Sequence, residues 1–200
     1  MINLAKLAYP VTALGPGKRL ALWTAGCPLS CKGCISPELL SAESGQKIAV
    51  PDLVQHITKI KGTFAGLSLS GGEPFVQAST LASLCEQLLN NFPDWNILAF
   101  SGYPLVYLQR HPQYHPLLAK INILIAGPYV VEQAIAHPLI GSANQQIHYL
   151  NDPQQTLKSA IESLPLQQVN IGLSQNNTHS IIGILAPDNR ALLHQQLSKR

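Results

Sequence analysis

The chain has 200 residues, of which 46% are hydrophobic and 12% are charged, and its formal net charge is +3. This length and apolar content suit one domain with a substantial core and exclude an intrinsically disordered chain. The lysines and arginines form no long basic run, so the charge does not indicate nucleic-acid binding. We expect no membrane span, signal peptide or disulfide scaffold, which makes the cytoplasm the expected compartment.

The order of apolar and polar residues predicts strands that alternate with helices. Apolar runs at 3–10 and 19–25 flank the turn Gly15-Pro16-Gly17, which indicates a β-hairpin. Further apolar runs predict strands at 66–70, 96–101, 121–125 and 146–150, and helical spacing predicts helices at 51–60, 78–89, 103–110 and 153–164. Strands joined through helices favour parallel pairing, and such sheets keep their active sites at the carboxyl edge.

The last part of the chain has a different pattern. Residues 168–173 and 179–185 alternate around Gln175-Asn176-Asn177, which predicts a second hairpin, and a final helix follows it. We interpret residues 1–200 as one domain with a core at about 19–150 and a C-terminal extension at about 151–200.

Three cysteines, Cys27, Cys31 and Cys34, stand in one short segment with the spacing Cys-x-x-x-Cys-x-x-Cys. A structural zinc site takes four protein ligands, and a 4Fe-4S cluster is usually held by four thiolates. Three thiolates leave one iron of such a cluster free to bind a small molecule. The spacing therefore favours a redox-active cluster enzyme, and a zinc site completed by His56 or His148 is the alternative.

A second motif, Leu67-Ser-Leu-Ser-Gly-Gly-Glu-Pro74, follows a predicted strand. Together with the cysteine motif, it resembles the radical S-adenosylmethionine (SAM) superfamily. The resemblance implies an α/β fold, namely a partial, open parallel β/α barrel with a small C-terminal hairpin and helix. It also implies that Cys27, Cys31 and Cys34 bind three irons of a 4Fe-4S cluster, while SAM chelates the fourth iron.

The resemblance implies a SAM site as well. Glu73 is expected to accept a hydrogen bond from the ammonium group of SAM, and the neighbouring glycines are expected to let the ligand approach the backbone closely. Polar residues after later strands are expected to line the same pocket. The implied cofactor-binding residues are Gly71, Gly72, Glu73, Pro74, Ser101, Gly102, Ser142 and Asn144, with Gln145 beside them.

Three further stretches narrow the resemblance to one group. Phe100-Ser-Gly-Tyr103, Ile123-Leu-Ile-Ala-Gly-Pro-Tyr129 and Gly141-Ser-Ala-Asn-Gln-Gln-Ile147 are similar, in order and type, to stretches of the activating proteins of anaerobic ribonucleoside-triphosphate reductase. That resemblance implies an enzyme that reductively cleaves SAM to a 5′-deoxyadenosyl radical and installs a glycyl radical on a partner enzyme. It implies a one-electron donor such as flavodoxin or ferredoxin. The charge distribution and the apolar runs indicate neither a nucleic acid nor a membrane as partner.

Three positions depart from that group's usual pattern. Ile35 stands where the group commonly has an aromatic residue, Ala126 where it has aspartate, and Ile140 where it has arginine. All three are expected where the substrate or partner makes contact, which keeps open a radical SAM enzyme that acts on a small molecule or peptide, for example of the carboxy-deazaguanine synthase kind. A separate alternative is a non-catalytic iron–sulfur or zinc module, against which the intact Glu73 argues.

Overall fold

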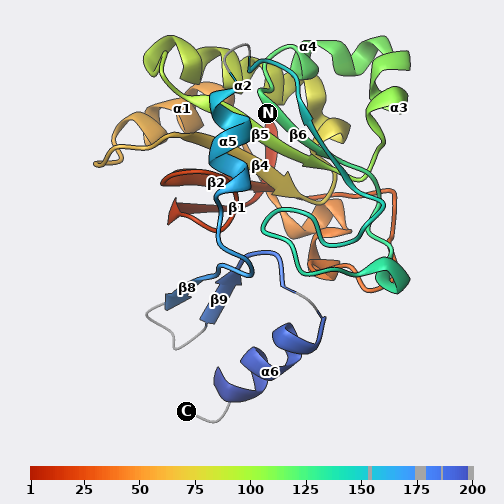
Figure 1. The fold of residues 1–200 in the computed structure, drawn as a ribbon. Helices are drawn as coiled ribbons and strands as arrows, with labels where there is room; N and C mark the ends of the chain where they lie inside the picture. Colours follow the sequence, from red (N-terminus) through yellow and green to blue (C-terminus); the bar gives the residue numbers. More distant parts are fainter. Residues whose placement is uncertain (153–154, 174–178, 186, 198–200) are drawn as a thin grey trace.

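The computed structural model describes residues 1–152, 155–173, 179–185 and 187–197 (Figure 1). Its centre is a seven-stranded sheet with the order β3-β1-β2-β4-β5-β6-β7, and β8 and β9 form a separate two-stranded sheet. The strands are β1 (Ile2–Val11), β2 (Arg19–Thr24), β3 (Gln46–Ile48), β4 (Gly66–Gly71), β5 (Asn96–Ser101), β6 (Ile123–Ala126), β7 (Gln146–Tyr149), β8 (Asn170–Leu173) and β9 (His179–Ile182).

The four central strands, β2, β4, β5 and β6, pair in parallel. Their residues are almost entirely buried, as expected for parallel strands that are covered on both faces. Because parallel strands end at the same edge, the segments that follow β2, β4, β5 and β6 all come together at the carboxyl edge of the sheet. The predicted mixed α/β fold with a mostly parallel sheet is therefore confirmed.

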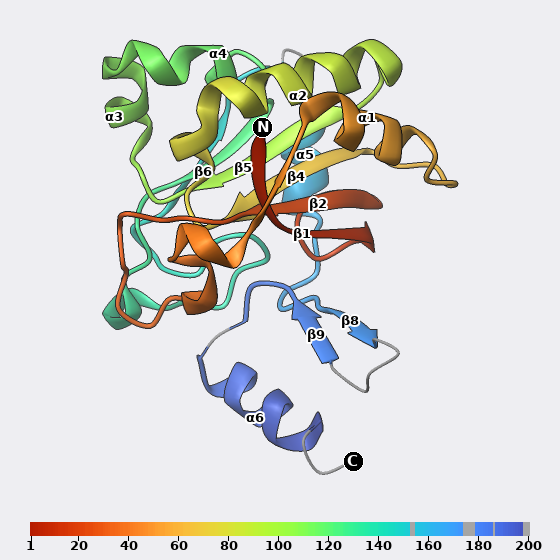
Figure 2. The same ribbon diagram turned by 180° about the vertical axis from the view of Figure 1, so that it is seen from behind.

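Helices cover one face of this sheet, and the C-terminal segment covers part of the other (Figures 1 and 2). Apolar residues of α1 and α2 pack on the first face with alternate residues of β2, β4 and β5. On the opposite face, Ile161 of α5 packs against Leu98, Ile123 and Ile125. The helices are α1 (Val50–Thr58), α2 (Ala78–Asn91), α3 (Leu105–Arg110), α4 (His115–Leu118), α5 (Thr156–Glu162) and α6 (Pro187–Leu197).

Both edges of the large sheet differ from a purely parallel arrangement. β1 pairs antiparallel with β2, as the predicted hairpin requires, and the unpredicted strand β3 pairs antiparallel with β1. β7 runs antiparallel to β6, because the segment between them, 127–145, contains no helix longer than one turn that could carry the chain back across the sheet. No helix was predicted between these two strands, so the expectation of parallel pairing for strands joined through helices does not extend to β7.

The C-terminal hairpin is present as predicted, with β8 antiparallel to β9. Its proposed turn, Gln175-Asn176-Asn177, lies outside the described residues, as do the first two positions of the helix expected at 153–164. In the part of the chain that the structure describes, no helix has the length and apolarity that crossing a bilayer requires.

Arg19 holds the amino ends of three central strands together. Its side chain is fully buried, and its guanidinium donates to Ser68 Oγ at 2.7 Å and to the carbonyls of Leu67, Asn96 and Pro16 at 2.9, 3.0 and 3.2 Å. Among the described residues no carboxylate forms an ion pair with it. Neutral acceptors therefore replace water around this cation, and the buried acceptors in turn depend on it.

We expect Arg19→Met to lower the free energy of unfolding by at least about 3 kcal/mol, because several buried acceptors lose their donor at once. The measurement is urea-induced unfolding. Lys18→Met is the matched control, since Lys18 is exposed one position earlier and its loss should change stability by less than about 0.5 kcal/mol. Equal effects of the two substitutions would show that the buried guanidinium does not support the sheet.

Candidate functional site

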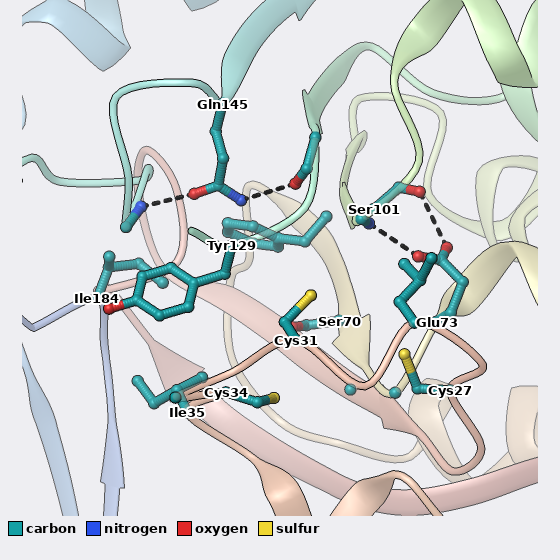
Figure 3. A pocket seen from close by; sticks show the side chains of 18 of the residues that line it. Cys27, Cys31, Cys34, Ile35, Ser70, Glu73, Ser101, Tyr129, Gln145 and Ile184 are labelled. Atoms are coloured by element: carbon teal, nitrogen blue, oxygen red, sulfur yellow. Dashed lines mark hydrogen bonds between the residues drawn. The ribbon is translucent and has the colours of Figure 1, made fainter. Parts of the chain in front are cut away.

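The cysteine segment forms a loop directly after β2, at the carboxyl edge of the sheet. The thiols of Cys27, Cys31 and Cys34 are free and half-buried, and all three residues line one pocket (Figure 3). The loop is stabilised by its own backbone, because the Cys27 N–H donates to the Leu40 carbonyl at 3.0 Å and the Cys34 N–H donates to the Cys31 carbonyl at 3.1 Å. The three thiols therefore share one short, tightly folded segment.

The Cys27 thiol lies in surroundings that disfavour its thiolate form unless a cation binds it. Burial raises the pKa of the Cys27 thiol, and backbone hydrogen bonding at Leu29 opposes that rise. The Cys34 sulfur accepts a hydrogen bond from the Ser36 N–H at 3.4 Å. A half-buried thiol becomes a thiolate most readily when a metal cation binds it. Three such donors on one loop fit an iron–sulfur cluster with three protein ligands.

The described residues contain no group of three or more Cys, His, Asp or Glu side chains already arranged around one point for a metal ion. In particular, no histidine completes a four-ligand zinc site with the cysteines there, since His56 is exposed on α1 and His148 lies on β7. Cys85 is fully buried in the core and burial raises its pKa to about 12, as expected for a structural thiol.

The glycine pair at the end of β4, Gly71 and Gly72, is in direct contact with the base of the cysteine loop. A Cβ on Gly71 would lie 2.3 Å from the backbone nitrogen and oxygen of Thr24, and a Cβ on Gly72 would lie 2.3 Å from the Gly26 oxygen. The Gly72 N–H donates to the Thr24 carbonyl at 2.8 Å, and the Glu73 N–H donates to the Gly26 carbonyl at 2.9 Å. These glycines therefore let the backbone at the base of the cysteine loop come close to the end of β4. This contact is separate from any approach of a ligand.

The carboxylate of Glu73 is buried and already bonded to the protein. Its Oε1 accepts from the Phe75 N–H and the Ser101 hydroxyl, both at 3.0 Å, and its Oε2 accepts from the Gly102 N–H at 2.8 Å. Burial raises the pKa of Glu73 to about 7, although these three donors favour the charged form. A carboxylate has about four acceptor positions, so at most one remains for a ligand.

Ser101 and Gly102, at the end of β5, line the pocket together with Glu73. Ser101 Oγ donates to Glu73 and also accepts from the Tyr103 N–H at 3.0 Å, which fixes the chain as it leaves the strand. A Cβ on Gly102 would lie 2.3 Å from the Leu29 side chain, so this glycine makes room for the cysteine loop. Pro74 is buried, begins a 3-10 turn and does not line the pocket.

The loop from 127 to 145 closes another side of the pocket. Gln145 lines the pocket, and its amide accepts from the Gly141 N–H at 2.8 Å and donates to the Gly127 carbonyl at 3.0 Å (Figure 3). Ser142 and Asn144 do not line it, because Ser142 Oγ accepts from the Val130 N–H and the Asn144 amide donates to the Pro128 carbonyl. The structure therefore gives these two residues a role in shaping the loop.

Several pocket residues were not among the predicted site residues. The Tyr129 ring lies in the pocket between the backbones of Gly33 and Gly141, where a Cβ would approach it to 3.5 and 3.2 Å. Ile184 and Leu185 reach the pocket from the segment after β9. Of the three departures, Ile35 lines the pocket, whereas Ala126 is buried in β6 and Ile140 is half-buried in an apolar cluster.

Comparison with known proteins agrees with this arrangement. Residues 13–148 match the model of the family described as "4Fe-4S single cluster domain". The chain is 36% identical over 149 residues to a protein of Vibrio cholerae named anaerobic ribonucleoside-triphosphate reductase-activating protein, which covers 70% of this chain and 94% of that protein. It is 29% identical over 151 residues to the protein of the same name from Escherichia coli, covering 71% and 96%.

A third relative carries a different name from the first two. A protein of Staphylococcus aureus named pyruvate formate-lyase-activating enzyme is 35% identical over 85 residues, which cover 40% of this chain and 34% of that protein.

We expect Gly71→Ala to reduce the iron that the protein retains after anaerobic reconstitution several-fold, because the new methyl group would push the cysteine loop away from β4. Gly62→Ala is the matched control. Both glycines have positive φ, +118° and +135°, so backbone strain is similar, but a Cβ at Gly62 meets only the Phe64 ring at 3.3 Å. Equal iron retention in the two variants would contradict the proposed coupling of the two loops.

Proposed function

The chain belongs to the radical SAM family of activating proteins with a single 4Fe-4S cluster, and from this premise we propose that it places a glycyl radical on a partner enzyme of the anaerobic ribonucleoside-triphosphate reductase type. One observation carries the proposal. The thiol loop and the Gly71-Gly72-Glu73 turn face the same pocket and are hydrogen-bonded to each other, so the sites expected for the cluster and for SAM form one unit.

In this proposal Cys27, Cys31 and Cys34 hold the cluster as thiolates, and the turn at 71–73 with the end of β5 holds SAM. A bound cluster would supply SAM with one electron taken from an external donor, and SAM would then be cleaved to methionine and a 5′-deoxyadenosyl radical. Glu73 is a positioning residue, because it fixes the backbone of the turn relative to Gly102 and keeps at most one acceptor position for the ligand. The surrounding apolar side chains exclude water.

The same proposal includes the type of barrel, the electron donor and the cellular compartment. We interpret the four parallel strands and their antiparallel edges as an open barrel of radical SAM type, whose carboxyl edge carries the pocket. The cysteine loop is at the surface, where Lys32 and Ile35 are exposed, and a small one-electron donor such as a flavodoxin or ferredoxin can approach the cluster there. The cytoplasm is the expected compartment for such a reaction.

The first test is anaerobic reconstitution with iron and sulfide, followed by incubation with SAM and dithionite. We expect 5′-deoxyadenosine as a product, and we expect Cys31→Ala to abolish it, because two thiolates do not retain the cluster. Cys85→Ala is the matched control, since that thiol lies in the core away from the pocket and its loss should leave the product in place. A protein that takes up zinc and no iron would instead support a structural metal module.

A second test concerns Glu73. We expect Glu73→Gln to weaken SAM binding about tenfold, because the new amide donor faces the Gly102 N–H and a hydrogen bond to a charged group is worth roughly 1.5–3 kcal/mol. Iron content should stay unchanged, since the three thiols are intact. The measurement is isothermal titration calorimetry with SAM, and Glu86→Gln, on the exposed face of α2, is the control. Unchanged SAM affinity in Glu73→Gln would remove the positioning role.

A further inference from the structure

The C-terminal segment lies beyond residues 13–148, which match the family model, and it packs on the sheet face opposite α1 and α2 (Figures 1 and 2). Ile161 of α5 is buried against the central strands. Ile182, the last residue of β9, is buried against Ala21 and Trp23 of β2. This extension is therefore an integral part of the described fold.

Hydrogen bonds hold the extension in one position on the turn that follows β1. Asn170 Oδ1 accepts from the backbone N–H groups of Thr12 and Ala13, both at 2.9 Å. The amides of Asn170 and Gln168 donate to Thr12 Oγ1 at 3.1 and 2.9 Å. Because four hydrogen bonds converge on two residues, the start of β8 has a defined place relative to the β1–β2 hairpin.

From this anchored hairpin the chain enters the pocket. Gly183 follows β9 with a φ of +154°, and Ile184 and Leu185 come next and line the pocket with the cysteine loop. Figure 3 shows Ile184 beside Tyr129 and Ile35, at the end of the pocket away from Glu73 and Ser101. The extension thus supplies one wall of the site, and it does so at the end that is not expected to hold the amino group of SAM.

Apolar and aromatic side chains make up much of the pocket lining, namely Ile35, Phe100, Tyr129, Leu139, Ile184 and Leu185. Of these, Figure 3 places Ile35, Tyr129 and Ile184 at the end away from Glu73, where the amide of Gln145 is already bonded to its own loop. Among the described residues that line the pocket, Glu73 is the one carboxylate and there is no lysine, arginine or histidine. A substrate carboxylate or phosphate at the apolar end would therefore lose part of its hydration without gaining a counter-ion, which disfavours its binding.

We infer that Ile184 is a specificity-determining residue, which admits a neutral peptide backbone segment to the pocket and excludes substrates that carry a negative charge next to the reacting carbon. The inference rests on the proposed function, from which it takes the radical chemistry. It adds a requirement that the substrate carry no negative charge next to the reacting carbon. It disfavours small carboxylated or phosphorylated molecules as substrates. It also assigns selectivity to the C-terminal segment, which lies outside residues 13–148, the part of the chain that matches the family model.

The test uses two capped five-residue peptides that differ only in charge. Each contains a central glycine with two deuterium atoms on its α-carbon, flanked by valines in one peptide and by glutamates in the other. When the α-carbon loses a deuterium atom to the radical made from SAM, the label appears in 5′-deoxyadenosine. We expect the neutral peptide to transfer at least about ten times more deuterium than the acidic peptide, and to bind the SAM-loaded protein correspondingly more tightly in calorimetry.

Ile184→Lys supplies the missing cation and should shift this ratio toward the acidic peptide by about tenfold, in both deuterium transfer and affinity. Ile171→Lys is the matched control, because Ile171 lies on β8 of the same hairpin, is 47% exposed and does not line the pocket. It should leave the ratio unchanged.

Two outcomes would overturn the inference. One is a ratio that Ile184→Lys does not alter, and the other is 5′-deoxyadenosine that carries no deuterium from either peptide. The absence of any 5′-deoxyadenosine from the reconstituted unsubstituted protein is a different result, since it would contradict the proposed function itself.

Discussion

The site depends on one close contact between two backbones, where the turn after β4 meets the base of the cysteine loop. Parallel pairing of β2 and β4 places the two strand ends side by side, with Thr24 opposite Gly71. Two successive residues without a Cβ then allow hydrogen bonds from Gly72 and Glu73 to reach Thr24 and Gly26. The thiol loop and the glycine turn consequently share a common backbone support, so a displacement of one displaces the other.

Glu73 extends this support to a third strand. Burying a carboxylate is costly, and the cost is offset when several donors surround it. Here the donors come from the turn itself and from Ser101 and Gly102 at the end of β5. The buried carboxylate therefore joins the loops that follow β4 and β5, and the Glu73 N–H, which donates to the Gly26 carbonyl, joins them to the loop after β2. Such a unit can keep the positions of two cofactors fixed relative to each other while each is held by a separate part of the chain.

The sequence predicted best the features that depend on local pattern. β2, β4 and β5 were located to within a residue, because continuous apolar runs mark strands buried on both faces. β3 was missed, since two of its three residues are exposed and polar and give no apolar pattern, and its pairing depends on β1. The direction of β7 was also missed, because it is set by the route of the preceding loop.

In the site, too, the features that depend on local pattern were predicted, whereas those that depend on distant segments were not. The cysteines and the glycine turn were expected in one pocket, and the structure places them there, because each motif follows the carboxyl end of its own strand. Ser142 and Asn144 bind their own loop, and the sequence does not distinguish an amide or hydroxyl that supports a backbone from one that faces a ligand. Ile184 could not be identified from its pattern, since an apolar residue after a short strand is ordinary and its pocket is formed by segments far away in the chain.

Chemistry and selectivity therefore come from different parts of this molecule. Glu73 and the thiols that we propose as cluster ligands belong to the segment that matches the family model, where three loops hold them in fixed relation. The apolar wall at the other end comes partly from the extension, which is anchored through backbone N–H groups of Thr12 and Ala13. This anchor does not involve the cysteine loop, and Ile184 takes no part in the hydrogen bonds that join the thiol loop, the glycine turn and the end of β5. The arrangement separates the residues that must stay fixed for radical formation from those that are free to determine which substrate approaches.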